Sequence, residues 1–309
     1  MCNWFGVTCS SRHHRVVSLN LSYLGLQGSI PPEIGNLSFL NSIDLSGNNF
    51  HGNLPMEEGM VHLRRLKYIS LAFNNFGGEV PSWFGSLPNL RVQDLSNNSF
   101  TGAIPISLFN ASKLESISIM FNQLQGNVPQ EIGNLVNLKV LRMANNQLTG
   151  LIPLTLFNIS SLQIVNLRNN TLSGDLPVNL CSKLSRLHGY YLAYNTLSGQ
   201  ILSRFDNCSE LEELSLNDND LNGTLPREIG NLTMLKLLSL GQNKFAGNLF
   251  FFFPFVFLSL SVYVWIYLLG DFDFVLIRFP YSINYALQNY LPIFFICSNK
   301  YFIAITSFC

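Results

Sequence analysis

The strongest constraint on the fold is a motif of about 24 residues that recurs ten times. Its clearest copy, Leu40 to Pro55, reads LNSIDLSGNNFHGNLP and has the skeleton L-x-x-I-x-L-x-x-N-x-F-x-G-x-L-P. One repeat of this size cannot bury its own apolar side chains, so neighbouring repeats must stack into a continuous core. The central position of the skeleton returns in steps of 24 to 26 residues, at Leu19, Ile43, Ile69, Gln93, Ile117, Leu141, Val165, Tyr190, Leu214 and Leu238.

Each copy carries three local signals that determine how its backbone runs. The segment Leu40-x-x-Ile43-x-Leu45 has the period of a strand with one buried face, so these strands should stack in parallel. A Gly in all ten copies, from Gly28 to Gly247, permits a turn that a Cβ would obstruct. An Asn that can satisfy backbone groups beyond the strand occurs at Asn48, Asn74, Asn98, Asn122, Asn146, Asn170, Asn195, Asn219 and Asn243.

The segment from Gly28 to Leu37, GSIPPEIGNL, joins a Gly-x-Ile-Pro turn to an Ile-Gly-Asn-Leu sequence. It resembles the plant-specific class of leucine-rich repeat. Roughly residues 2 to 249 resemble the ectodomains of plant leucine-rich-repeat receptor-like kinases, most closely immune receptors of the flagellin-receptor kind. The resemblance implies an α/β-type leucine-rich-repeat solenoid of about ten stacked repeats, with a parallel β-sheet on its concave face.

We expect three parts, namely a partial cysteine cap at 1–15, the repeats at 16–249 and a hydrophobic tail at 250–309. The cap reads Cys2-Asn-Trp-Phe-Gly-Val-Thr-Cys9, which resembles the end of the family's N-terminal cap. Because the two cysteines pair in that family, the resemblance implies a Cys2–Cys9 disulfide. No apolar leader precedes Cys2, so we expect the sequence to be truncated at its front.

Composition excludes some classes of partner and favours an exported surface. Lys plus Arg equals Asp plus Glu at 18 each, which gives no indication of a nucleic-acid partner. No metal or cofactor motif is present, and Arg12-His-His-Arg15 is interpreted as a solvated link. Sequons typical of a glycosylated surface occur only in the repeats, at Asn20, Asn36, Asn97, Asn110, Asn158, Asn169, Asn207, Asn222 and Asn231, although an Asn- and Ser-rich repeat also generates them by chance.

A ligand would bind to the outward positions of the strand segments, which line the concave face in this fold. Most of these positions hold small or polar residues, as expected of a solvated sheet. Exposed aromatics beside arginines are typical of interface hot spots, whereas single exposed aromatics are common and need no function. Arg142 and Arg168 are diagonal neighbours that could share one ligand carboxylate. The predicted ligand-binding residues are Phe73, Met120, Phe121, Arg142, Arg168, Tyr191 and Tyr194.

Several residues depart from the repeat. Gln93 and Tyr190 occupy central core positions, where a buried amide requires a hydrogen-bond partner. Cys181 and Cys208 lie in adjacent repeats and could pair, but the default prediction is a free, buried Cys208 thiol.

The repeat stops at Phe250, where the pattern requires a proline. Residues 249–269 contain no charge and are long enough to cross a bilayer as one helix. Three interpretations compete: a transmembrane anchor, a non-native tail such as translated intron sequence, and a soluble core segment. The second is favoured for the origin of the tail, since the family completes its repeats and a C-terminal cap before the membrane.

No kinase, hydrolase or nucleotide-binding motif is present, so the chain is not expected to be an enzyme. The resemblance implies an extracellular domain at the plasma membrane that binds a peptide or protein ligand, together with a co-receptor built of similar repeats, in signalling or defence. The alternatives are a secreted plant enzyme-inhibitor-like repeat protein and a non-functional fragment of a receptor kinase gene.

Overall fold

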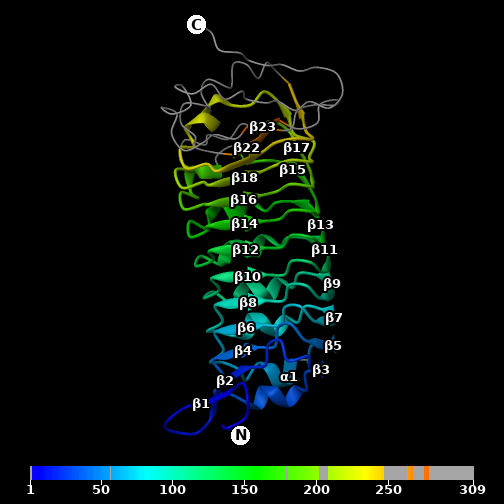
Figure 1. The fold of residues 1–309 in the computed structure, drawn as a ribbon, viewed down its shortest axis with the longest axis vertical. Coiled ribbons are helices and arrows are strands. Elements are labelled where there is room, and N and C mark those ends of the chain that lie inside the picture. Colours follow the sequence, from blue (N-terminus) through cyan, green and yellow to red (C-terminus); the bar gives the residue numbers. More distant parts are fainter. Residues whose placement is uncertain are drawn as a thin grey trace, which may run out of the picture. The chain divides into compact units, whose positions relative to one another are not determined.

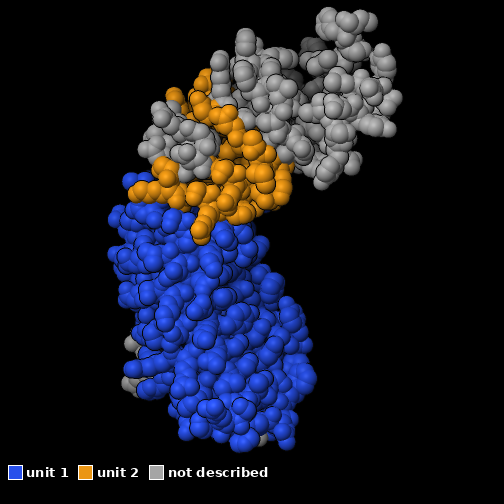
Figure 2. All heavy atoms as spheres, turned by 90° about the vertical axis from the view of Figure 1, so that its left-hand side faces the viewer, with its two compact units in different colours: residues 1–171 blue, residues 172–309 orange. Residues whose placement is uncertain are grey.

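The computed structural model describes residues 2–55, 57–177, 180–201, 208–246, 263–266 and 275–277, some of them by backbone alone. The chain divides into two compact units, Met1–Thr171 and Leu172–Cys309, which Figure 2 colours separately.

In the first unit the predicted strands stack in chain order into a parallel sheet (Figure 1). Each strand pairs with the strand one repeat later at the same repeat position, for example Ile43 with Ile69 and Leu141 with Val165. The central side chains point into the core, since Ile43 is 1% exposed. The strands are β2 (Val16–Asn20), β4 (Ser42–Asp44), β6 (Tyr68–Ser70), β8 (Val92–Asp94), β10 (Ser116–Ser118), β12 (Val140–Arg142) and β14 (Ile164–Asn166).

A second set of parallel strands forms in this unit beyond the asparagine of each repeat. Short 3-10 helices then return the chain toward the next strand, and each begins directly after the proline of the apolar-proline pair. The strands are β3 (Gln27–Gly28), β5 (Asn49–Asn53), β7 (Asn75–Glu79), β9 (Ser99–Ala103), β11 (Gln123–Asn127) and β13 (Gln147–Leu151). The helices are η1 (Pro32–Asn36), α1 (Glu57–Met60), η2 (Ser82–Ser86), η3 (Ile106–Asn110), η4 (Gln130–Asn134) and η5 (Leu154–Asn158), of which α1 is α-helical.

The asparagine column has the structural role that its position predicts. The Nδ2 group of Asn98 donates to the carbonyl oxygens of Leu71 and Leu95 at 2.9 and 3.1 Å. Its Oδ1 atom accepts from the backbone N–H of Phe76 at 3.0 Å. One side chain thus satisfies backbone groups in both its own coil and the preceding coil, which joins successive coils at the bend after the strand.

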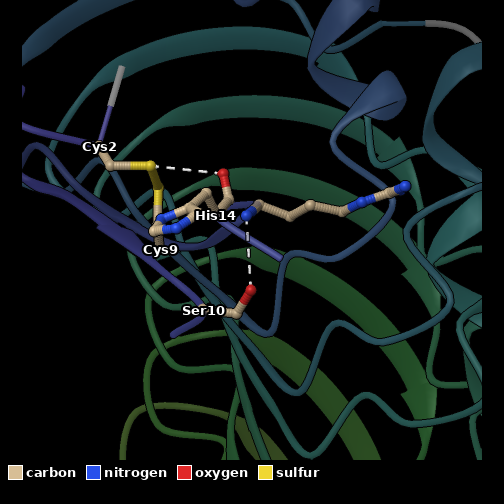
Figure 3. The surroundings of a disulfide bond; sticks show 5 residues. Cys2, Cys9, Ser10 and His14 are labelled. Carbon is tan, nitrogen blue, oxygen red and sulfur yellow. Dashed lines mark hydrogen bonds between the residues drawn. A yellow bond between two sulfur atoms is a disulfide. The ribbon is translucent and has the colours of Figure 1, made fainter. Parts of the chain in front are cut away.

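The N-terminal cap covers the first strand of the sheet. Strand β1 (Val7–Cys9) pairs antiparallel with β2 and brings Val7 opposite Leu19. A disulfide joins Cys2 to Cys9, with their Cα atoms 5.5 Å apart. Figure 3 shows Cys2 Sγ next to the carbonyl oxygen of His14, 3.4 Å away, while Ser10 Oγ accepts from the backbone N–H of Arg15. The edge of the sheet that the first repeat would present to water is therefore paired.

The second unit repeats the same plan. Its first sheet contains β16 (Gly189–Tyr191), β18 (Glu213–Ser215) and β20 (Leu237–Ser239), with Leu214 in register with Tyr190 and Leu238. The remaining repeat elements are β15 (Thr171–Asp175), whose first residue belongs to the first unit, β17 (Thr196–Ser198), β19 (Asn222–Gly223), β21 (Lys244–Phe245), η6 (Leu180–Ser182) and η8 (Arg227–Asn231).

One interpretation of this part of the chain is not supported, and one prediction is wrong. Within the candidate membrane span 249–269, the described residues Tyr263–Ile266 form strand β22, which pairs in parallel with β20. Strand β23 (Val275–Ile277) then pairs antiparallel with β22. Without β22, the edge of β20 would leave backbone N–H and C=O groups unpaired. An apolar segment can satisfy these groups by adding a strand to that edge. No helix among the residues placed in the structure has the length and apolar character needed to cross a membrane.

The second correction concerns Cys208, which is disulfide-bonded and not a free thiol. It is 1% exposed, so its prediction as buried is confirmed. Neighbouring coils stack about 5 Å apart, within the range of Cα separations that a disulfide allows, and this makes a link between adjacent repeats sterically accessible. The side chain of Cys181 lies outside the described residues.

Candidate functional site

The outward side of the strand face ends in a column of residues with left-handed backbone. The column holds one residue per repeat, three positions after the end of each strand. Its φ angles fall between 52° and 67° at Tyr23, Gly47, Phe73, Asn97, Phe121, Asn145, Asn169, Tyr194, Asp218 and Gln242. The abundance of Gly, Asn and Asp was the sequence signal for this conformation, because those residues adopt it most readily.

Aromatic residues occupy this column in alternate coils of the first unit. Tyr23, Phe73 and Phe121, here called the aromatic column, are 73%, 56% and 49% exposed. The backbone fixes their positions, since the Phe73 N–H donates to Ser96 O at 2.9 Å and the Phe73 carbonyl accepts from Asn48 N–H at 3.1 Å. A bulky side chain costs roughly 1–2 kcal/mol in left-handed backbone. The fold therefore carries strain to present three rings to solvent. Sequence reasoning had omitted Tyr23.

The neighbouring column is mostly buried, which corrects its assignment as solvent-facing. Ala72 and Ser96 are 3% exposed and Ala144 is 2% exposed. Small residues predominate at this position. Two predicted ligand-binding residues differ from their neighbours in the column: Met120 is half-buried and Arg168 is exposed.

The charged groups of the first unit's face are separated along the stack. Arg142 pairs in register with Asn166, and Arg168 lies two residues further along that coil, with its N–H donating to Asn166 Oδ1 at 3.2 Å. Nearer the N-terminus, Asp44 and Asp94 lie on either side of the strand that holds Tyr68. Partial burial, followed by the nearby Asp44 carboxylate, raises the pKa of the Tyr68 phenol. The face is thus acidic at one end and basic at the other.

The remaining predicted residues, Tyr191 and Tyr194, belong to the second unit. Tyr194 is 43% exposed and has the left-handed backbone of its column. Tyr191 is half-buried, and its hydroxyl donates to the Glu213 carboxylate at 2.8 Å. That hydrogen bond holds the Tyr191 side chain against its neighbouring strand.

The predicted glycosylation sites differ in accessibility. Asn97 is half-buried in the left-handed column and Asn207 lies outside the described residues. The Nδ2 group of Asn169 donates to Asn145 Oδ1 at 2.8 Å. The asparagines exposed to solvent are Asn20, Asn36, Asn110, Asn158, Asn169, Asn222 and Asn231. Within the described part of the chain, no cluster of three or more His, Cys, Asp or Glu residues could hold a metal ion.

Comparison with known proteins identifies the repeat. A family model described as "Leucine rich repeat" matches residues 64–124. A second, "Leucine Rich Repeat", matches residues 15–37, 137–159, 161–183 and 210–232. The LRR receptor-like serine/threonine-protein kinase EFR of Arabidopsis thaliana is 52% identical over 58 residues, which are 19% of this chain and 6% of that protein. A putative leucine-rich repeat receptor-like kinase, At2g24130 of Arabidopsis thaliana, is 43% identical over 70 residues, or 23% of this chain and 7% of the relative. The matched segments thus span only a small part of these relatives.

Solved structures match over a longer stretch. The plant peptide hormone receptor RGFR1, in complex with RGF2, aligns with a TM-score of 0.71 and 34% identity over 77% of this chain and 37% of that chain. The ectodomain of the Arabidopsis receptor kinase HAESA, in complex with an IDA peptide hormone, aligns with a TM-score of 0.64 and 27% identity over 79% of this chain and 49% of that one. A plant ice-binding protein aligns with a TM-score of 0.71 and 29% identity over 80% of this chain and 78% of its own length.

Proposed function

Because the chain is a leucine-rich-repeat protein of the plant receptor-like-kinase ectodomain type, we propose that it recognises an extracellular peptide through its strand face. The observation that carries the proposal is the aromatic column, three exposed rings held on strained backbone in alternate coils. Strained residues persist where the surrounding structure enforces them, and they cluster at ligand-binding sites. The exposure of Phe73 and Phe121 fits anchors that a partner covers.

The spacing of the aromatic column favours an extended ligand. Coils stack about 4.8 Å apart, so rings in alternate coils repeat every ~9.6 Å. A peptide in the polyproline II conformation advances ~3.1 Å per residue and brings every third side chain to the same face, which is a repeat of ~9.3 Å. Such a peptide could place one side chain beside each ring. Arg142 and Arg168 would bind a carboxylate at one end, and Asp44 and Asp94 would favour a cationic group at the other.

The resemblance to receptor ectodomains supports a plasma-membrane receptor with this domain outside the cell. Related structures contain peptide hormones, and one contains HAESA with IDA and the co-receptor SERK1. We propose that a co-receptor with similar repeats also joins this chain when ligand is bound. The signalling output, whether defence or development, depends on the peptide and on the rest of the receptor.

The proposal can be tested with a random peptide library displayed on phage and selected against the secreted chain. Affinity of each enriched peptide would be measured for the unmodified chain and for the double variant F73N/F121N. Asn suits the left-handed backbone, as Asn97 and Asn145 show, so this variant removes the rings without damaging the turn. Loss of two anchor rings should weaken binding at least tenfold.

The matched control is I106N/L154N. These two apolar residues are 59% and 73% exposed, but they lie on the 3-10 helices η3 and η5 and not on the strand face. Binding by the control should equal that of the unmodified chain. If enriched peptides bind F73N/F121N as tightly as the unmodified chain, the strand face is not the ligand site.

A further inference from the structure

A second surface of the first unit carries an uncompensated positive charge. It lies where the chain enters the strands, at the positions two, four and five residues before each central strand residue. Across the seven coils of this unit these positions hold seven cations and one acid, Glu115. The cations, here called the basic edge, are Arg15, Arg64, Arg65, Lys67, Arg91, Lys113 and Lys139, and all seven are exposed.

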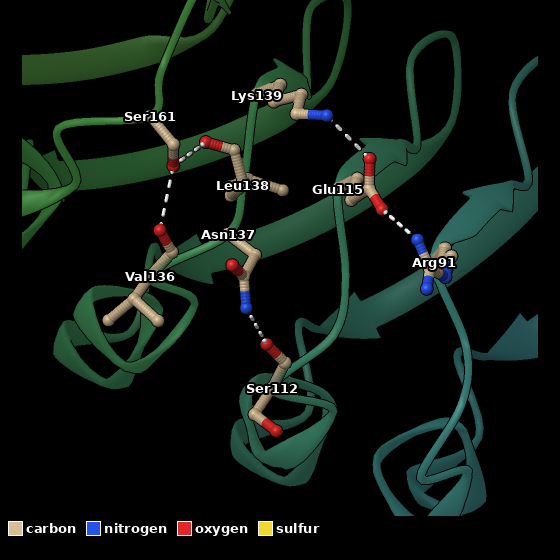
Figure 4. A network of polar contacts seen from close by, with 8 residues as sticks. All are labelled: Arg91, Ser112, Glu115, Val136, Asn137, Leu138, Lys139 and Ser161. Atoms are coloured by element: carbon tan, nitrogen blue, oxygen red, sulfur yellow. Dashed lines mark hydrogen bonds and ion pairs between the residues drawn. The ribbon is translucent and has the colours of Figure 1, made fainter.

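The contacts within the basic edge show how little of its charge is neutralised. Glu115 accepts from Arg91 at 2.8 Å and from Lys139 at 2.7 Å, so one carboxylate serves two cations (Figure 4). Lys113 donates to the neutral side chain of Asn89 at 2.7 Å. Among the described side chains, Arg15, Arg64, Arg65, Lys67 and Lys113 form no ion pair.

Two of these cations lie against the same aromatic ring. The guanidinium groups of Arg15 and Arg65 lie 4.3 and 4.2 Å from the centroid of the same Phe39 ring. Each contact is attractive, but placing two cations on one ring works against their mutual repulsion. An anion bound beside them would relieve that repulsion. The guanidiniums are therefore pre-organised for a negatively charged partner.

The fold itself does not require cations at these positions. In other coils of the same unit the positions are filled by Asn41, Asn137, Ser161 and Gln163. Figure 4 shows Asn137 and Ser161 instead donating to carbonyl groups of the preceding coil, beside the row of charged residues. In the second unit the equivalent positions are balanced, since they hold two cations, Arg186 and Lys236, and two acids, Glu210 and Glu212. Lys236 pairs with Glu212 at 2.5 Å. The excess charge is thus confined to the first unit.

From these observations we infer that the basic edge binds a linear acidic polysaccharide, lying across successive coils of the first unit. Its cations follow the stacking direction at intervals of one or two coils, which are about 5 Å each. A polyuronate carries one carboxylate per sugar at a spacing of the same order, so several contacts can form along one chain. The choice of a polysaccharide over a nucleic acid rests on the extracellular placement proposed above. The surface is separate from the strand face and needs no peptide ligand.

The test measures binding of polygalacturonate to the secreted full-length chain at several salt concentrations. The double variant R65Q/K67Q removes two basic-edge cations, and R142Q/R168Q removes the same charge from the strand face as a matched control. We expect R65Q/K67Q to bind at least tenfold more weakly, and the slope of log K against log salt concentration to fall by about two, one per lost cation. We expect R142Q/R168Q and F73N/F121N to bind like the unmodified chain, so a failed peptide site would leave this result intact.

Replacing Glu115 should change the affinity for polygalacturonate in the opposite direction. E115Q removes the acid of the basic edge and should strengthen binding severalfold, which a merely unfolded variant could not do. The inference is overturned if R65Q/K67Q binds normally, if R142Q/R168Q loses as much affinity, or if fully methyl-esterified polygalacturonate binds equally well. Tighter binding of polyglutamate than of polygalacturonate at equal charge would instead assign the surface to an acidic protein.

Discussion

Gln93 lies in register with Ile117 of the adjacent strand, yet its side chain is a fully buried amide where the adjacent strand has an aliphatic residue. Neither the Oε1 nor the Nε2 atom of Gln93 has a hydrogen-bond partner among the described residues. An unsatisfied buried amide costs about 1–3 kcal/mol. The sequence skeleton identified the position, and within the described part of the chain no partner compensates for the buried amide.

We therefore predict that Gln93→Leu stabilises the protein. The variant removes two unsatisfied polar atoms and restores the apolar residue of the other repeats, which should raise the free energy of unfolding by about 1–3 kcal/mol. Urea denaturation followed by circular dichroism would measure the change. An unchanged midpoint would show that the amide has a partner, such as a buried water.

Tyr190 presents a related case in the second unit. Its side chain is fully buried, its hydroxyl has no partner among the described residues, and burial raises the pKa of the phenol far above its ordinary value. Tyr190→Phe keeps the ring and removes the hydroxyl, so stability should rise by roughly 1 kcal/mol. Thermal unfolding checks this, with Tyr194→Phe as the exposed control that should shift Tm little.

The asparagine column gives the opposite prediction. Asn98→Ala leaves the N–H of Phe76 and the carbonyl of Leu71 without their side-chain partner, which should cost about 2–4 kcal/mol because several hydrogen bonds are lost at once. Asn137→Ala is the control: Asn137 is exposed and makes one bond, to Ser112 O at 3.0 Å. If both variants unfold at the same urea concentration, the column is not what joins the coils.

The variant Phe121→Asn compares the backbone strain at this position with the stabilisation from packing of the Phe121 ring. The substitution relieves left-handed strain of about 1–2 kcal/mol and loses the burial of half a ring, roughly 1 kcal/mol. Stability should therefore stay within about 1 kcal/mol of the unmodified chain, whereas Phe121→Val should be destabilising because a β-branched residue tolerates this backbone poorly. A calorimetric comparison decides the point. Equal losses for both variants would mean that the strain is negligible.

Acidic pH should weaken the ion pairs of Glu115 slightly. Hydrogen bonding from Lys139, together with that from Arg91, lowers the pKa of the Glu115 carboxyl. A carboxyl whose pKa is lower in the folded state than in the unfolded state stabilises the fold at pH values above its unfolded-state pKa. This stabilisation is lost as the pH falls through the folded-state pKa. Because the pair is largely solvent-exposed, Glu115→Gln should cost less than about 1 kcal/mol at pH 7 and nothing at pH 2. A pH-independent difference between the two proteins would contradict this linkage.

The repeat period was enough to predict the fold, since the register, the buried central residues and the asparagine contacts all depend on a pattern that is local and repeated. The left-handed column was not predicted, because its Asn, Asp and Gly signal is interrupted by Tyr23, Phe73 and Phe121, which are rare in that conformation. Sequence reasoning proposed Phe73 and Phe121 as ligand contacts from their chemistry, and both are exposed. It misjudged the adjacent column because small residues suit a solvated surface and a tight turn equally well.

The conformation of the tail and the disulfide of Cys208 could not be predicted from local sequence. The first depends on a free strand edge and the second on another cysteine, and in both cases the partner lies in a distant segment of the chain. The basic edge was likewise hidden in the sequence, because the overall charge of the chain is balanced. Only the stacking of coils brings residues about 24 positions apart into one charged row.

The most direct test of the proposed function is site-specific photo-crosslinking. Benzoylphenylalanine would replace Phe121 on the strand face or, in a matched sample, Ile106 on η3, and each protein would be irradiated with the same library-selected peptide. The account predicts a peptide adduct from position 121 that excess unlabelled peptide suppresses, and none from position 106. An adduct formed only at position 106 would place the ligand on the helical side of the repeats and contradict recognition through the aromatic column.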